Sequence, residues 1–247
     1  MPVCTISRSL ALALLFIKEQ LKEPVALFWM IISPVTTYYL LTYSRGGLSP
    51  SGVSYIESTS WFYAYISSSV AFFGFSFYIV GRRESGYIRS FVYTSDAKLI
   101  FMVAQFLAYS LIALIYCATF YALTYFSFGS FNLSDLLQVI SRFYICYILF
   151  VVPGILLGFL PLSFQNANTI FSIVSFLMLV FGILSAGGLH PVVEAVNKVN
   201  PLFVANKLMV GGYEKYYILI FWIIGSFAAI FLLSLRFLRI NPVWSRY

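Results

Sequence analysis

The sequence has little charge, few cysteines and one histidine. Only 9% of the 247 residues are Asp, Glu, Lys or Arg, whereas soluble domains contain about a quarter of such residues. A soluble fold of this length could not bury a hydrophobic fraction of 61% in one core. The alternative solvent is lipid, so the composition predicts an integral membrane protein.

The scarcity of reactive residues excludes several kinds of site. Cys4, Cys117 and Cys146 are too scattered for a disulfide framework or a metal cluster, and the latter two lie in apolar runs typical of buried thiols. His190 alone cannot build a metal site, so we interpret it as a structural residue at the membrane interface. The Gly-x-x-x-x-Gly-Lys-Ser/Thr, His-Glu-x-x-His and Gly-x-Ser-x-Gly motifs are all absent from the sequence. We therefore predict no nucleotide, metal or catalytic site of those kinds in this chain.

Long stretches without charged residues are the main feature that is present. A helix needs about 20 apolar residues to cross the hydrocarbon core of a bilayer. Stretches of that kind, with a break at the polar turn 161–168, predict six membrane-spanning helices in one all-α domain covering residues 1–247. Their expected ranges are about 24–43, 60–80, 99–126, 142–160, 168–186 and 216–238.

The distribution of Lys and Arg predicts the orientation of the chain. The net charge of +7 flanks the apolar runs, which is typical of a membrane protein and gives no reason to expect nucleic-acid binding. With both termini inside, ten of the 15 Lys and Arg residues fall on the cytoplasmic side and five outside. Because cytoplasmic loops carry the positive excess, we expect both termini in the cytoplasm and the protein in the inner or plasma membrane.

The segment before the first expected span, residues 5–23, is predicted to form an amphipathic helix in the membrane interface. Its apolar residues recur at helical spacing and form a stripe: Ile6, Leu10, Ala13, Leu14, Ile17 and Leu21. Most of its charged residues lie off this stripe. The alternative is a cleaved signal peptide built on residues 10–17. No small-x-small cleavage site follows before Lys18, which favours the interfacial helix.

The uncharged spans bear on the source of energy. Ion-driven transporters place Asp, Glu, His or Lys inside their spans, and none of these occurs in the expected apolar cores. A chain that moves a substrate uphill would therefore take its energy from a separate polypeptide on the cytoplasmic side. The loop 81–98 is the candidate docking segment because it mixes charges with apolar residues spaced four apart. A solvated connector that serves only topology is the alternative.

Three segments resemble, in order and spacing, the type-2 ABC exporter permeases, a six-span family without a fused ATPase. The amphipathic opening and residues 22–28 are similar to that family's entry into span one. Residues 83–87, Arg-Glu-Ser-Gly-Tyr, resemble its Arg-Glu-x-Gly-Thr stretch, with tyrosine for threonine and with Asp96 where proline is usual. Residues 182–191 and 199–203 resemble its Ser-Gly…Pro and Asn-Pro-Leu/Thr motifs after span five.

The resemblance implies a homodimer of this chain that works with two copies of a separate ABC ATPase subunit. ATP and Mg²⁺ would bind to that ATPase, and this chain would hold no cofactor while contacting membrane lipid. Segment 187–212 would form a re-entrant element in the outer leaflet before the last span. The resemblance also assigns a coupling helix that contacts the ATPase, formed by Arg82, Arg83, Glu84, Ser85, Gly86, Tyr87, Ile88 and Arg89.

The resemblance further places a substrate route along spans two and five, which are rich in aromatic and hydroxyl side chains. The candidate lining residues are Phe72, Phe73, Phe77, Phe171, Ser175 and Met178. Helix packing or lipid contact is the alternative role for these aromatics. Such side chains suit an amphipathic passenger, so we expect export of hydrophobic drug or antimicrobial-peptide-like substrates, as in antibiotic efflux. The alternatives are a polysaccharide or glycolipid exporter and, from another class, a non-transporting membrane scaffold or immunity protein.

Overall fold

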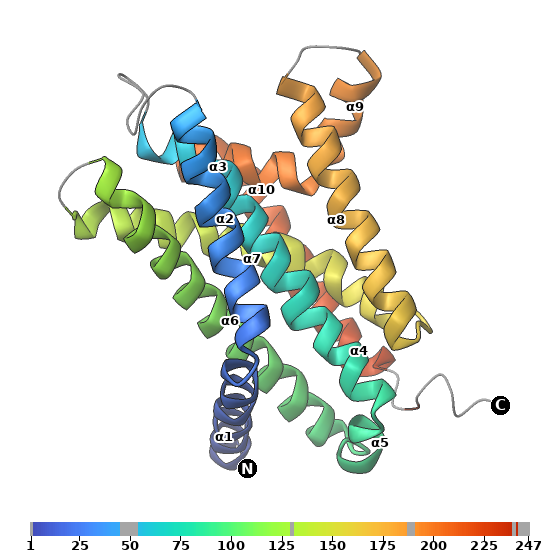
Figure 1. The fold of residues 1–247 in the computed structure, drawn as a ribbon. Helices are drawn as coiled ribbons and strands as arrows, with labels where there is room; N and C mark the ends of the chain where they lie inside the picture. The colour runs from blue at the N-terminus through green and yellow to red at the C-terminus, as the bar shows by residue number, and fades with distance from the viewer. Residues whose placement is uncertain (1, 45–53, 129–130, 187–190, 239–240, 242–247) are drawn as a thin grey trace.

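Every regular element in the described part of the chain is helical (Figure 1). The structure is a computed structural model that describes residues 2–44, 54–128, 131–186, 191–238 and 241. The expectation of an all-helical, multi-pass membrane protein is confirmed at this level. His190, Gly187 and Gly188 lie outside the described residues, as do three of the cations counted for orientation, Arg45, Arg239 and Arg246.

Five helical stretches in the described residues are long and apolar enough to cross a membrane. The first, Tyr55–Glu84, joins α3 (Tyr55–Ser69), the π-helix η1 (Val70–Ser76) and α4 (Phe77–Glu84). The others fall in α6 (Ser95–Thr124), α7 (Leu133–Phe159), α8 (Phe164–Ala186) and α10 (Pro201–Phe237). α2 (Pro24–Ser44) has 21 residues and no charged residue, and its length of about 31 Å also matches a bilayer core.

Side-chain caps explain where several of these helices begin. Ser54 and Glu57 form a reciprocal capping box at the start of α3. The Thr94 hydroxyl accepts from the Ala97 amide at the start of α6, 3.2 Å away. Asn132 and Asn200 accept from the second backbone amide of α7 and α10, each at 3.0 Å. These caps satisfy amides that have no partner within the helix.

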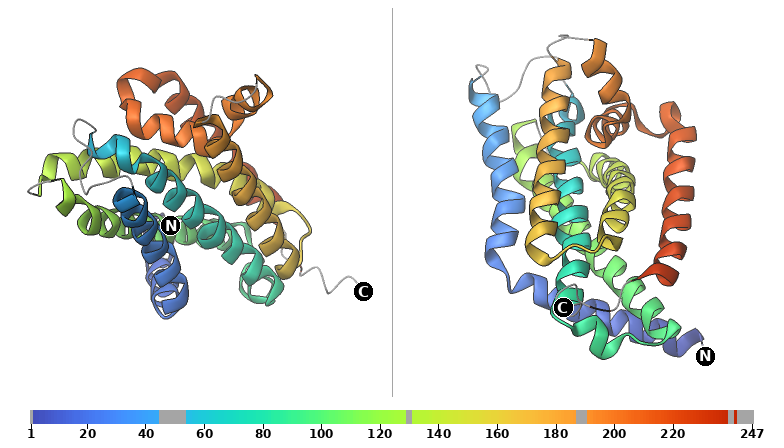
Figure 2. Two further views of the ribbon diagram at one scale, coloured as in Figure 1. Left: turned by 45° about the horizontal axis from the view of Figure 1, so that its top comes forward. Right: turned by 90° about the vertical axis from the view of Figure 1, so that its right-hand side faces the viewer.

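The elements at one end of the bundle differ from the spans in direction. α1 (Pro2–Leu21) lies across this end, nearly perpendicular to α2 and α8 (Figure 2, right). The short helix α5 (Tyr87–Phe91) lies at the same end. The helix α9 (Pro191–Val199) lies at the opposite end. The two ends of the bundle are therefore built differently.

The helix that contains η1 is the centre of the bundle. In its apolar 18-residue stretch, 72% of the residues are buried inside the protein, compared with 22% in that of α8 and 11% in that of α10. At the start of this helix, the Tyr55 hydroxyl forms hydrogen bonds with the hydroxyls of Tyr63 (2.7 Å) and Thr124 (2.8 Å). Because lipid tails are as apolar as the side chains themselves, close packing and hydrogen bonds hold such helices together.

η1 packs against α7 at an unusually close approach. A Cβ atom at Gly154 would lie 2.2 Å from the Ser76 hydroxyl oxygen, and that hydroxyl donates to the Ala71 carbonyl at 2.9 Å. Gly154 directly follows Pro153, whose missing amide leaves another break in helical hydrogen bonding. Two irregular helix segments therefore lie side by side in the middle of the bundle.

α10 is interrupted at Gly212 (φ 67°, ψ −167°) and Tyr216 (φ −125°, ψ 25°). Arg142 of α7 donates to the Met209 and Val210 carbonyls, at 2.7 and 3.3 Å, where the first half of α10 ends. The guanidinium thus pairs with carbonyls that the break leaves without helical partners. The expected last span, about 216–238, begins after this break.

The described part of segment 187–212 consists of α9 and the first half of α10. The buried Asn197 side chain donates to the Phe181 carbonyl at 2.8 Å, and the buried Asn200 side chain donates to the Met178 carbonyl at 2.9 Å. These bonds attach the segment to α8. In Figure 1 the first half of α10 crosses the end of the bundle that carries α9.

We expect Gly154→Ala to destabilise the protein by about 1–3 kcal/mol, because the new Cβ overlaps the Ser76 hydroxyl. Gly158→Ala is the matched control on the same helix, since its Cβ would meet nothing within 4 Å. Adding Ser76→Ala to Gly154→Ala removes the clashing oxygen and should restore part of the stability. Thermal unfolding in detergent measures the stability of the wild type and of the three variants. Equal losses for Gly154→Ala and Gly158→Ala would contradict the close approach.

Candidate functional site

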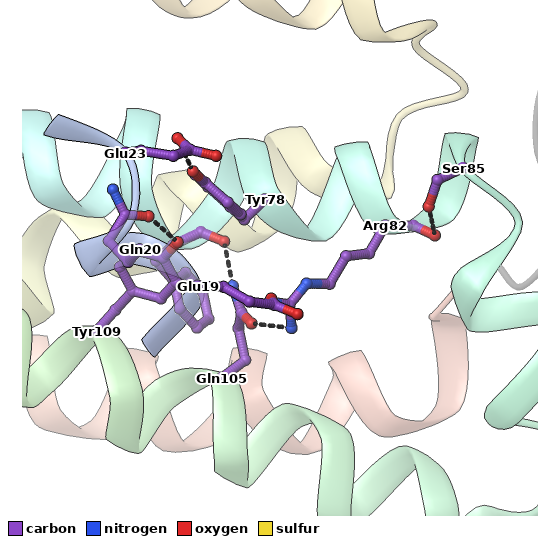
Figure 3. Close-up of polar contacts among 9 residues, drawn as sticks. Glu19, Gln20, Glu23, Tyr78, Arg82, Ser85, Gln105 and Tyr109 are labelled. Atoms are coloured by element: carbon purple, nitrogen blue, oxygen red, sulfur yellow. Dashed lines mark hydrogen bonds and ion pairs between the residues drawn. The ribbon is translucent and has the colours of Figure 1, made fainter. Parts of the chain in front are cut away.

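Arg82, at the end of α4, joins three helices at one polar junction (Figure 3). Its guanidinium donates to the Glu19 carboxylate of α1 at 2.6 Å and to the Gln105 side-chain oxygen of α6 at 3.2 Å. It also lies 3.3 Å from the centre of the Phe16 ring. The Arg82 side chain is 11% exposed and that of Glu19 is 53% exposed. The contact with the Phe16 ring and the hydrogen bond to Gln105 therefore stabilise Arg82 more than the water-screened ion pair with Glu19 does.

Two further contacts fix the end of α1 beside Arg82. The Tyr78 hydroxyl of α4 donates to the Glu23 carboxylate just after α1. The Tyr109 hydroxyl of α6 donates to the buried Gln20 side-chain oxygen at 2.8 Å. Figure 3 shows these side chains converging from α1, α4 and α6. The amphipathic helix is thus attached to the bundle through polar groups as well as through apolar packing.

Arg83 points away from this junction and contacts the other side of the bundle. It is 2% exposed and donates to the Gly158 (3.0 Å), Leu160 (3.1 Å) and Leu162 (2.5 Å) carbonyls. These carbonyls belong to the C-terminus of α7 and the turn into α8, where helical partners are lacking. Its Nε also pairs with Glu84 at 3.1 Å. Consecutive arginines therefore connect the end of α4 to α1 and α6, and to α7 and α8.

The rest of the predicted coupling residues form the turn and short helix that follow. The Ser85 hydroxyl donates to the Arg82 carbonyl at 3.1 Å, and Gly86 forms the turn into α5. Within α5, Ile88 is fully buried, whereas Arg89 is exposed. Burial raises the pKa of Tyr87, while the Arg82 charge opposes this rise, so Tyr87 is neutral at physiological pH. The predicted set thus divides into inward-facing anchors and an outward-facing surface.

That outward surface, which we call the α5 surface, consists of Arg89, Ser90, Phe91 and Tyr93. Phe91 is 64% exposed and Tyr93 is 68% exposed. Arg89 is among the predicted coupling residues, whereas Phe91 and Tyr93 are not. Ile88 and Val92, four residues apart, are both buried, and this identifies Phe91 because residues between these anchors face outward. Tyr93 follows Val92 and is exposed beyond the end of α5.

A groove of about 460 Å³ lies between α2, α3, η1 and α8. Its lining combines aromatic and aliphatic side chains with hydroxyl groups and contains no ionisable group other than a tyrosine: Trp29, Met30, Tyr65, Ser69, Phe73, Ser172, Ser175, Phe176 and Leu179. The buried Ser175 hydroxyl has no hydrogen-bond partner among the described residues. We call this the aromatic groove.

Of the six predicted pathway residues, Phe73 and Ser175 line the aromatic groove. Phe72 and Phe171 are buried and stack on each other with centroids 5.8 Å apart. Phe77 packs on Phe164 at 4.4 Å, and Met178 is 8% exposed. These four residues form packing around the groove.

Seven lining residues lie outside the predicted set of six. Five of them lie on α3 and α8, at spacings of three, four or eight residues from Phe73, from Ser175 or from one another: Tyr65, Ser69, Ser172, Phe176 and Leu179. That spacing could have identified them once the two helices were paired. Trp29 and Met30 come from α2, which the sequence-based prediction did not place beside spans two and five.

η1 lies between the aromatic groove and the polar junction. The Gln105 amide, whose oxygen accepts from Arg82, donates to the Phe75 carbonyl of η1 at 3.3 Å. Gln105 is fully buried in α6. One side chain therefore contacts both the arginine of the junction and the π-helix that carries Phe73. Within the described residues, no cluster of three or more His, Cys, Asp or Glu could hold a metal ion.

Comparison with known proteins gives a similarity that extends over nearly the whole chain. The chain is similar to Protein McbE of Escherichia coli, with 29% identity over 239 residues. The aligned part covers 96% of this chain and 98% of McbE, so it is not confined to one segment or motif. No protein-family model matches the chain.

We expect Arg82→Met to release the end of α1 and to cost about 1–3 kcal/mol, because Glu19, Gln105 and Phe16 lose their shared partner. Trypsin should then cleave faster at Lys18 and Lys22 in the protein held in detergent. Arg89→Met is the control, since Arg89 is exposed on α5. Unchanged cleavage and thermal stability in Arg82→Met would contradict the attachment of α1 through this residue.

Proposed function

We propose that this chain is the membrane permease subunit of an ATP-driven exporter. Two copies of it would form a homodimer, and two separate ABC ATPase subunits, which bind ATP and Mg²⁺, would dock at the α5 end. The main support is the geometry after α4. A short helix with an exposed basic and aromatic surface is fixed to both sides of the bundle through Arg82 and Arg83.

The proposed membrane arrangement has six spans, formed by α2 and the five apolar stretches. α1, α5 and the end of α10 lie at the same end of the bundle (Figure 2), which would be the cytoplasmic end. The amphipathic α1 would then lie in the inner interface. α9 and the first half of α10 would form the re-entrant element of the outer leaflet. Arg142 supports this because it bonds to a backbone carbonyl near the break in α10. Asn197 and Asn200 support it because they hold the segment against α8.

The proposed coupling runs through contacts in the bundle. Movement of α5 by the ATPase would act on α1 and α6 through Arg82, and on the α7–α8 turn through Arg83. It would also act along α4 and η1 on Phe73 and Ser69, which line the aromatic groove. π-helical segments often occur at functional sites. Here η1 would absorb displacement between the two ends of one continuous helix.

The aromatic groove supports an uncharged or amphipathic passenger. Its volume of about 460 Å³ is within the range of sites for drug-sized molecules. Its hydroxyl groups, including that of Ser175, which has no partner among the described residues, offer hydrogen bonds without a fixed charge. These features favour hydrophobic drug or antimicrobial-peptide-like substrates over a polysaccharide chain.

Docking is tested by the variant Arg89→Glu/Phe91→Ala on the α5 surface. An ABC ATPase should co-purify with the tagged wild-type chain from native membranes and be identified by mass spectrometry. We expect the variant to lower its recovery more than about tenfold, because exposed aromatic and arginine residues dominate interfaces. Lys215→Glu/Phe126→Ala, at the other end of the bundle, is the matched control and should change nothing.

Two results would contradict the proposal. If no ATPase co-purifies with the wild-type chain, the exporter assignment fails. If an ATPase co-purifies but its hydrolysis-dead form leaves efflux of a neutral hydrophobic dye unchanged, the chain is a membrane scaffold. Equal recovery of the ATPase with the α5 variant and with the wild type would mean that the ATPase docks on another surface.

A further inference from the structure

A second groove, which shares no lining residue with the aromatic groove, lies where α1 meets α6 and α7. It has a volume of about 590 Å³. α6 lines it with Leu107, Leu111 and Leu114, on successive turns. These turns give it a length of about 10 Å along the helix. Leu14 and Ile17 of α1 also line it. We call it the α1 groove.

The Ser110, Ser141 and Tyr144 hydroxyls in the α1 groove are already paired. The Tyr144 hydroxyl donates to the Ser110 hydroxyl at 3.2 Å. The Ser141 hydroxyl donates to the Gln138 carbonyl at 2.9 Å. The remaining lining is mostly leucine, isoleucine and alanine. The groove therefore favours a hydrocarbon chain over a polar ligand.

The rim of the α1 groove on α1 is basic. Lys18 follows the lining residue Ile17 and lies one helical turn after Leu14, and Lys22 directly follows the end of α1. The acidic residues of this region, Glu19 and Glu23, contact Arg82 and Tyr78 of the bundle instead. The ion pairs of the described residues are Arg82–Glu19 and Arg83–Glu84. Lys18 and Lys22 are thus exposed cations without an acidic partner there.

We propose that the α1 groove binds an acyl chain of an anionic phospholipid whose phosphate contacts Lys18 and Lys22. A bilayer phospholipid combines the two chemistries that this site offers, a long hydrocarbon and an anionic headgroup at the level of an interfacial helix. Lysine side chains near an apolar surface extend their charges to the headgroup region. The lipid would fill the space between α1 and the spans and hold α1 against them.

Native mass spectrometry of the purified, delipidated full chain tests this proposal, with dioleoylphosphatidylglycerol and dioleoylphosphatidylcholine as the two probes. We expect one tight phosphatidylglycerol adduct and weaker phosphatidylcholine binding. Lys18→Gln/Lys22→Gln should weaken phosphatidylglycerol binding about fivefold per lysine. Lys215→Gln is the control for loss of charge and should bind as the wild type does.

The groove itself is tested by Leu111→Trp, which places a large side chain in it. This variant should lose the tight adduct, whereas Leu123→Trp, also on an exposed position of α6 but outside the groove, should keep it. The lysine variants are at exposed positions and keep the test open if Leu111→Trp does not fold. Equal binding of the two lipids, or full binding by the lysine variants, would overturn the proposal. A tight adduct retained by folded Leu111→Trp would also overturn it.

Discussion

The structure depends on two consecutive arginines that point in opposite directions from the end of α4. Arg82 pairs with α1 and α6, and Arg83 pairs with carbonyls at the α7–α8 turn. Both are largely buried, so each needs its partners to offset the loss of water. The helix that carries them is also the most buried span. A displacement at this point would therefore change contacts on both sides of the bundle, which is what a coupling element requires.

The same constraint governs the polar groups at the other end. In a low-dielectric surrounding, backbone groups released by a helix break must find partners within the protein. Arg142 contacts carbonyls at the end of the first half of α10, and Asn197 and Asn200 attach this region to α8. The few polar residues in an otherwise apolar chain are thus concentrated where helices bend or end. Their positions are structural requirements before they are functional ones.

Charge-free length was enough to predict most of the helices, because a span must be long and apolar whatever it packs against. The same criterion gave a wrong helix boundary where charged residues form hydrogen bonds within the protein. α7 begins at Leu133, nine residues before the expected start near 142, since Asp135 accepts from Tyr125 and Arg142 is bonded to α10. For the site, the loop was identified but its inward and outward residues were not distinguished. That division, and η1, depend on tertiary contacts such as Gly154 against Ser76, which no local pattern encodes.

α1 takes part in both the proposed coupling and the proposed lipid binding, because its different sides contact different parts of the structure. One side packs on α6 through Phe16 and Gln20, and a second lines the α1 groove through Leu14 and Ile17. The charged residues Lys18 and Lys22 are exposed. A shift of α1 that broke the Arg82–Glu19 contact would also reshape the α1 groove, since both involve the same rigid helix. Lipid in that groove and a partner at α5 would then influence each other's binding through α1, as linkage between two sites on one movable element requires.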